Sequence, residues 1–158
     1  MSARSRHKSK QALRFDATGA WQIDAPADKA AFIRALGALL PAGSWLVLEN
    51  TTFADEVRVF LESRQPANPP RLRHGTIWPR SRLLHLPATP ENLDALARLF
   101  ETHLVPEVCC HLRAYHENRL LLEWWDVDCD DPCYLASSVD ANVLQVFCQR
   151  LGCARLLH

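Results

Sequence analysis

The sequence predicts an α/β (α+β) domain, with a mixed, largely antiparallel sheet of about five strands around a central β-hairpin, packed by about four helices. Two observations carry this prediction. Short apolar runs bounded by turn residues are typical of buried strands, and between them apolar residues recur at the 3.6-residue spacing of helices. No internal repeat interrupts this order. Packing helices on a sheet buries the apolar surfaces of both.

The composition is that of an ordinary globular protein, with 48% hydrophobic and 23% charged residues in 158, which excludes wholesale disorder. No apolar stretch approaches the roughly 20 residues that span a bilayer. The basic N-terminal residues lack the apolar run of a signal peptide. We therefore expect a cytoplasmic protein with reduced cysteines, in which residues 1–14 form a flexible basic tail and residues 15–158 a single domain.

The formal net charge of zero conceals an asymmetry along the chain. Residues 1–82 contain 13 Lys and Arg against 7 Asp and Glu, whereas residues 83–158 contain 5 against 11. Such a split is typical of a charged tail or a dipolar binding surface, although separate solvated faces also produce it. Nucleic acid could bind through phosphate contacts, but no aromatic residue in the tail offers a stacking platform. The basic groups available are the tail with Arg71, Arg73, Arg80 and Arg82.

The first half of the domain is predicted to contain two helices and a strand. Residues 24–26 combine an aspartate cap with a first-turn proline, and apolar residues follow at helical spacing. The run WLVLE at 45–49 predicts a buried strand. Thr52 and Asp55 form a loose capping box that predicts the second helix.

Residues 65–82, QPANPPRLRHGTIWPRSR, form the longest irregular segment. Their four prolines forbid a continuous helix, and a loop of this length in a compact domain is typically functional or mobile. Trp78 is expected to pin the loop to the body, because large aromatic side chains are mostly buried. An exposed anchor for a partner is the alternative.

The second half predicts a strand, a helix, the hairpin, another helix and a last strand. Residues 83–86 are the first of these strands, and Thr89 caps the helix that follows it. After the hairpin, Ser137 and Asp140 offer a capping box, and Gly152 ends the last helix in a left-handed conformation. The five residues that follow form the last strand.

The hairpin lies within 109–125, where the register decides which side chains share a face. A two-residue turn would mix polar and apolar groups on both faces. A three-residue turn at 116–118 instead separates an apolar from a polar face, as a half-buried antiparallel pair requires. This register places His111 opposite Glu123. It gathers five side chains on the polar face: His111, Arg113, Tyr115, Arg119 and Glu123.

This region leaves two alternatives open that would make the protein a hydrolase-like enzyme. A His111–Glu123 pair would orient the imidazole and raise its basicity, as in a general-base dyad, although ordinary surface pairing also produces it. A metal could be held by alternating aspartates like those that open an EF-hand Ca²⁺ loop: Asp126, Asp128 and Asp130. The match then fails, because Asp131 replaces the required glycine and Ser137 the bidentate glutamate.

Zinc is the other metal for which ligand types are present. Cys129 and Cys133 with His111 or His116 could bind it, but their spacing is not the C-x2-C doublet of structural zinc sites. Cys148 and Cys153 repeat a similar interval, but Cys109, Cys110 and Cys148 fit small apolar core positions better. A cysteine nucleophile is disfavoured, because neighbouring aspartates raise a thiol pKa. The chain also lacks a phosphate-binding glycine loop.

The sequence therefore favours a non-enzymatic protein-binding domain without a cofactor. Aromatic and arginine side chains are enriched in binding hot spots, and an adjoining acidic loop speeds association with a basic partner. An immunity protein, an inhibitor, or an accessory subunit of a bacterial defence or toxin–antitoxin system fits this pattern. The predicted binding residues are Arg113, Tyr115, Arg119, Trp125, Asp126, Asp128, Asp130 and Asp131.

Overall fold

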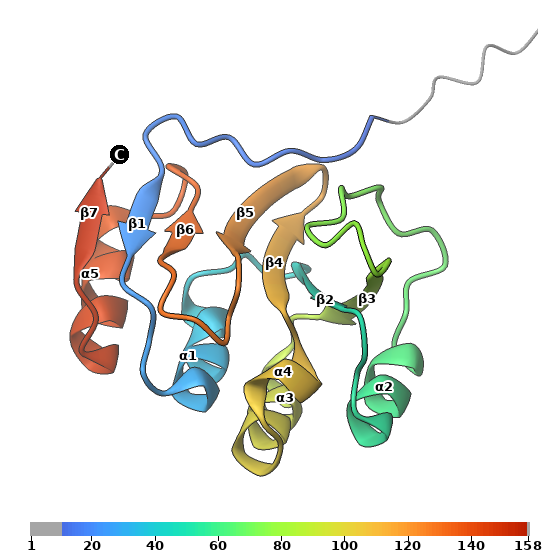
Figure 1. The fold of residues 1–158 in the computed structure, drawn as a ribbon. Helices are drawn as coiled ribbons and strands as arrows, with labels where there is room; N and C mark the ends of the chain where they lie inside the picture. Colours follow the sequence, from blue (N-terminus) through green and yellow to red (C-terminus); the bar gives the residue numbers. More distant parts are fainter. Residues whose placement is uncertain (1–10, 158) are drawn as a thin grey trace, which may run out of the picture.

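The computed structural model describes residues 11–157, which form an antiparallel sheet of seven strands with helices packed on it (Figure 1). The order across the sheet is β3-β2-β4-β5-β6-β1-β7, and every neighbouring pair is antiparallel. This confirms the predicted class, with seven strands in place of about five. The strands are β1 Trp21–Ile23, β2 Trp45–Asn50, β3 Arg82–Pro87, β4 His111–His116, β5 Arg119–Trp124, β6 Cys133–Leu135 and β7 Arg155–Leu157.

The helices pack on one face of the sheet and form the main core with it. The ring of Phe32 lies edge-on to Trp124, with centroids 5.0 Å apart, and to Phe147 at 5.6 Å. No helix in the described part of the chain has the length and apolar character to cross a bilayer. The helices are α1 Lys29–Ala35, continued by the 3-10 turn Leu36–Ala38, α2 Asp55–Glu62, α3 Pro90–Thr102, α4 Val105–Val108 and α5 Ala141–Leu151.

Four helix termini show how far the local sequence sets the boundaries. Thr89 caps α3 as predicted, accepting the N–H of Asn92 at 3.2 Å, and Gly152 ends α5 with φ +65°. Helix α1 starts later than expected, because Asp28 rather than Asp24 accepts a backbone N–H of its first turn. The predicted capping box at α2 is wrong, since Ala54 occupies the N-cap. A side-chain cap is therefore not required where tertiary packing fixes the start.

The opposite face of the sheet is covered by the segment 63–81, which we call the long loop. Leu72 of this loop packs on Val47, Tyr115 and Leu120 of the sheet, and all four side chains are buried. The N-terminal segment joins the cover, because the N–H of Leu13 donates to a carbonyl of the loop at 2.8 Å. The predicted irregular segment is thus confirmed, and it forms a second layer over the sheet.

The hairpin between β4 and β5 has a different register from the predicted one. Its turn has two residues, because His116 pairs with Arg119, and a bulge follows at Ala114/Tyr115. Beyond the bulge Arg113, not His111, lies opposite Glu123, so the predicted His111–Glu123 pair is wrong. The bulge adds Leu121 on β5, whereas the predicted turn adds His116, and either solution separates an apolar from a polar face.

Candidate functional site

A buried carboxylate organises the loop-covered face of the sheet. Glu49 on β2 has an exposed fraction of 0%, yet four donors converge on its two oxygens. Its Oε1 accepts the backbone N–H groups of Gly75 and Thr76 at 2.8 and 2.9 Å and the hydroxyl of Ser81 at 2.6 Å. Its Oε2 accepts Nη2 of Arg113 at 2.5 Å. We call these five residues the Glu49 network. It ties the long loop to the centre of the sheet.

The charges of this network compensate one another. Burial alone raises the pKa of Glu49, but the hydrogen bonds from Ser81, Thr76 and Gly75, with the charge of Arg113, outweigh burial and hold the pKa below its usual value. Arg113 is 2% exposed, and its Nη1 donates to the carbonyl of Arg73 at 2.6 Å. A carboxylate ionised in this environment requires its cation, so the pair is a single structural unit.

His111 and Trp125 border the Glu49 network on the side of the loop that follows β5. The imidazole Nδ1 accepts the backbone N–H of Asp126 at 3.0 Å, so the ring proton resides on Nε2, 3.1 Å from the hydroxyl of Thr76. Gly75 lies against both rings. A Cβ at this position would be 2.2 Å from Trp125 and 2.7 Å from His111. Only glycine fits here.

Ser81 and His74 resemble two parts of a hydrolase triad, but their arrangement differs from it. Ser81 Oγ lies 2.9 Å from Nδ1 of His74 and donates to Glu49 at 2.6 Å. In a triad the histidine stands between the nucleophile and the carboxylate, whereas here the hydroxyl stands between them. Ser81 is also 3% exposed. The hydroxyl therefore bridges two side chains and is not activated for attack.

The long loop carries an exposed apolar tip between two residues of this network, Thr76 and Ser81. Ile77 and Trp78, which we call the tip, are 82% and 89% exposed. The expectation that Trp78 packs on the body is therefore wrong, and the alternative of an exposed side chain holds. The residues on either side of the tip are fixed, because Thr76 and Ser81 both bind Glu49. The tip is a pair of large apolar side chains on a rigid base.

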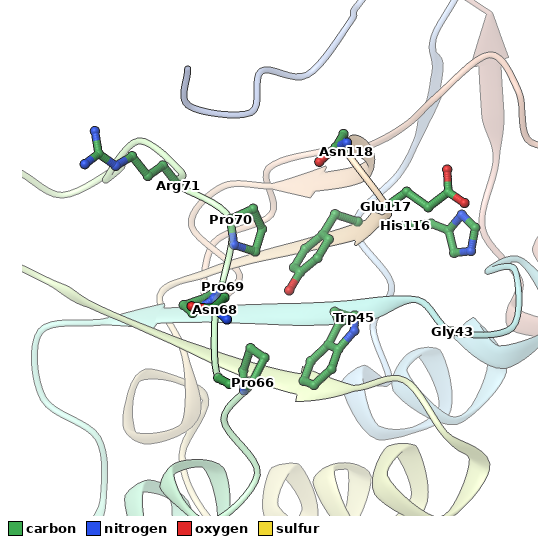
Figure 2. A pocket seen from close by; sticks show the side chains of 12 residues that line it. Gly43, Trp45, Pro66, Asn68, Pro69, Pro70, Arg71, His116, Glu117 and Asn118 are labelled. Carbon is green, nitrogen blue, oxygen red and sulfur yellow. The ribbon is translucent and has the colours of Figure 1, made fainter. Parts of the chain in front are cut away.

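A pocket of about 580 Å³ lies at the other end of the loop-covered face. Figure 2 shows the prolines of the long loop and Trp45 around it, with the turn at Glu117 and Asn118 beside them. Tyr115 contributes to the lining, and its hydroxyl lies 3.0 Å from Nδ1 of His85. Burial raises the pKa of Tyr115 to about 12, and burial with the charge of Arg113 lowers that of His85 to about 4. Both groups are therefore neutral at pH 7.

The structure divides the predicted binding residues among four places. Arg113 and Tyr115 are both buried, and Tyr115 lines the pocket described above. Arg119 is exposed at the far end of the hairpin, and Trp125 is partly buried next to His111. Four remain exposed together on the loop 126–131, which we call the acidic loop: Asp126, Asp128, Asp130 and Asp131. Their role in binding stays a prediction.

The predicted metal ligands do not come together as expected. Among the described residues, one group of three has ligand atoms within 4.8 Å of one another: Cys110, His111 and Asp126. The three alternating aspartates do not form such a group, and neither do Cys129 and Cys133 with a histidine. Cys133 is fully buried on β6, and Cys129 is exposed. All six cysteines are free thiols.

The basic surface proposed for nucleic acid is only partly described. Most of the tail lies outside the described residues. The four arginines of the long-loop region, Arg71 to Arg82, are exposed. One of them is engaged, because Nη2 of Arg82 lies 2.6 Å from a carboxylate oxygen of Glu62.

Glu49, at the centre of the site, is a functional candidate that the sequence pattern did not indicate. Glu49 was expected only as the last residue of a strand. A charged residue in a buried apolar run needs a partner, and this requirement was the available signal. A comparison of the chain with models of known families, with characterised proteins and with solved structures found no match.

Proposed function

We propose that this chain is a protein-binding domain that engages a basic partner protein with the Ile77–Trp78 tip and the adjoining acidic loop. The observation that carries the proposal is the exposure of Trp78, at 89%, on a loop whose base is held by a fully buried carboxylate. Large apolar side chains that project from a fixed base are what a binding hot spot requires.

The rigidity of the base favours affinity. Burying a tryptophan side chain removes roughly 150–250 Å² from water, worth about 4–6 kcal/mol at ~25 cal/mol/Å² before the costs of association. A mobile loop would lose part of this gain in ordering. Here the Glu49 network has already ordered the loop, so the tip is presented in one conformation.

The acidic loop shares the support of the tip, which places the two features on one surface. Asp126 donates its backbone N–H to His111, and His111 contacts Thr76 at the base of the tip. Exposed carboxylates beside an apolar anchor steer a basic partner to it and discriminate against acidic ones. An immunity or inhibitor protein that covers a basic toxin or nuclease would use such a surface.

The test compares the tip with an equally apolar residue elsewhere. The full-length chain, tagged and cross-linked in its host, is used to identify a partner, which is then titrated against purified variants. We expect Trp78→Ala to weaken binding by about 30-fold or more, as a hot-spot residue does. Leu104→Ala removes a side chain that is 72% exposed outside the tip and leaves binding unchanged.

The contribution of the acidic loop is tested by a second variant and a matched control. Asp128→Lys is expected to slow association and to reduce its dependence on salt, whereas Asp24→Lys, an exposed aspartate outside the acidic loop, has no such effect. Both tip and loop variants keep the unfolding free energy within about 0.5 kcal/mol, as exposed positions usually do. Equal binding by Trp78→Ala and the wild type would refute the proposal.

A further inference from the structure

We propose that Cys110, His111 and Asp126 form a site for a thiophilic divalent cation of the Zn²⁺ type, at the junction of β4 and the acidic loop. The three ligand atoms lie within 4.8 Å of one another. Cys110 and His111 are consecutive at the start of β4, and Asp126 follows the end of β5. The site shares Asp126 with the acidic loop, but the binding of a cation does not require a partner protein.

The distances are close to those that a bound ion requires. Tetrahedral Zn²⁺ with bonds of about 2.0–2.3 Å separates its ligand atoms by about 3.3–3.8 Å. Nδ1 of His111 and Oδ1 of Asp126 are already 3.7 Å apart. The other ligand atoms come within bonding distance of one ion if the side chains of Cys110 and Asp126 rotate. Cys110 is half-buried and Asp126 is exposed.

The backbone around the site is held in place from both sides. The N–H of Cys110 donates to the carbonyl of Glu49 at 2.8 Å, and the carbonyl of Cys110 accepts the N–H of Val127 at 2.8 Å. Asp126 itself adopts a left-handed conformation, with φ +49°. A conformation that is rare for a residue with a side chain fixes the point at which the carboxylate leaves the chain. Cys110 and His111 are therefore held in position, and Asp126 is the ligand that has to adjust when a cation binds.

His111 is in the tautomer that a metal needs. Its Nδ1 lone pair points at Asp126, where it accepts a backbone N–H, and its Nε2 faces the hydroxyl of Thr76. Metal-bound histidines commonly donate their other ring N–H to an oxygen in this way. A cation on Nδ1 takes the place of the Asp126 N–H, so the start of the acidic loop shifts as the metal–nitrogen bond forms.

The ligand types select the metal class. One thiolate, one imidazole and one carboxylate suit Zn²⁺ or Co²⁺, whereas Ca²⁺ and Mg²⁺ take oxygen ligands. Three protein ligands leave one tetrahedral position for water. The carboxylate of Asp128 is exposed on the same loop and is not one of the three ligands.

Titration of the full-length protein with Co²⁺ tests this assignment. We expect one equivalent to produce the visible d–d absorption of a tetrahedral ion together with a thiolate-to-cobalt charge-transfer band, and Zn²⁺ to displace it. Cys110→Ser removes the charge-transfer band and weakens Co²⁺ binding by more than about 100-fold, beyond the loss seen for outer-shell partners. Cys129→Ser, an exposed thiol on the same loop, retains both signals.

A second pair of variants addresses the carboxylate. Asp126→Asn, which tolerates the left-handed backbone, weakens binding strongly, whereas Asp128→Asn does not. Thr76→Val removes the partner of the imidazole and lowers affinity by about 10- to 100-fold. Absence of the charge-transfer band in the wild type, its persistence in Cys110→Ser, or its loss in Cys129→Ser overturns the site. None of these readouts depends on a partner protein, so the site and the proposed function fail separately.

Discussion

The two ends of the loop-covered face are built in opposite ways. At the Glu49 end, one buried carboxylate takes four hydrogen bonds, three of them from the second half of the long loop. At the Trp45 end, the first half of the same loop spans a pocket of about 580 Å³. Leu72, between them, packs on the sheet by apolar contact.

The difference shows how one irregular segment serves two purposes. Backbone N–H groups that bind a carboxylate have fixed positions and directions, so the backbone conformation of residues 74–81 is tightly constrained. Apolar contact and proline rings specify the loop less strictly and leave space beneath it. The rigid end carries an exposed tip, and the looser end carries a pocket. Breaking each end separately measures what it contributes.

The largest effect is expected from the rigid end. Glu49→Ala leaves Arg113 as a buried cation without its partner and removes the acceptor of three loop donors. Loss of one member of a buried ion pair typically lowers the unfolding free energy by about 3–5 kcal/mol. Urea denaturation at pH 7 measures it. The control is Glu62→Gln, which breaks exposed ion pairs with Arg58 and Arg82 and should change stability far less. Equal losses in both would show that the buried pair has no special role.

At the Trp45 end, we expect the stability of the protein to depend on pH through His85. His85 is buried and neutral, with a pKa of about 4 against a usual value of 6.5. Between these values the unfolded chain binds a proton that the folded chain does not, so stability falls as the pH drops from 6.5 to about 4, by roughly 3 kcal/mol in total.

This pH dependence can be assigned to one residue. Glu49 has a pKa below its usual value of 4.5, so its contribution is lost only at still lower pH. Glu123 acts in the opposite direction, because burial raises its pKa above 4.5. The difference between the wild type and His85→Gln from pH 7 to 5 therefore measures the contribution of His85. The wild type should lose more stability than His85→Gln as the pH falls, and equal slopes would mean that His85 is accessible to protons in the folded state.

A smaller effect is expected at the glycine that lets the loop approach the sheet. Gly75→Ala drives a methyl group into Trp125 and His111, and overpacking of this kind typically costs about 1–3 kcal/mol. Gly37→Ala is the control, since its Cβ would meet nothing closer than 3.4 Å. Thermal unfolding with tryptophan fluorescence measures both. If Gly75→Ala is as stable as Gly37→Ala, the loop lies less tightly on the sheet than the Glu49 network implies.

Much of the fold could be predicted from the sequence because its signals are local. The strand at 45–49, the Thr89 cap and the Gly152 terminus rest on residues within a few positions of one another. The strands β1 and β6 were not predicted, because three residues are too few to show a period. The hairpin register was wrong because a bulge and a longer turn satisfy the same apolar pattern.

The site was predicted less well, since its contacts join distant segments. Arg113 was placed on the correct face of its strand, but its partner Glu49 lies 64 residues away in the chain. Trp78 was expected to be buried from the general preference of aromatic residues, and the structure shows the reverse. Local patterns indicate which residues share a strand face. They do not indicate which loop will cover that face.

The position of β1 in the sheet has a consequence for the order in which the protein folds. β1 is synthesised first but lies between β6 and β7, which are synthesised last. Strands β2 to β5 pair with one another, and all four precede β6 and β7 in the chain, so they can pair while the ribosome is still adding residues. β1 has to wait with both of its edges unpaired until the rest of the chain emerges. Closure of the sheet is therefore a late event of biosynthesis.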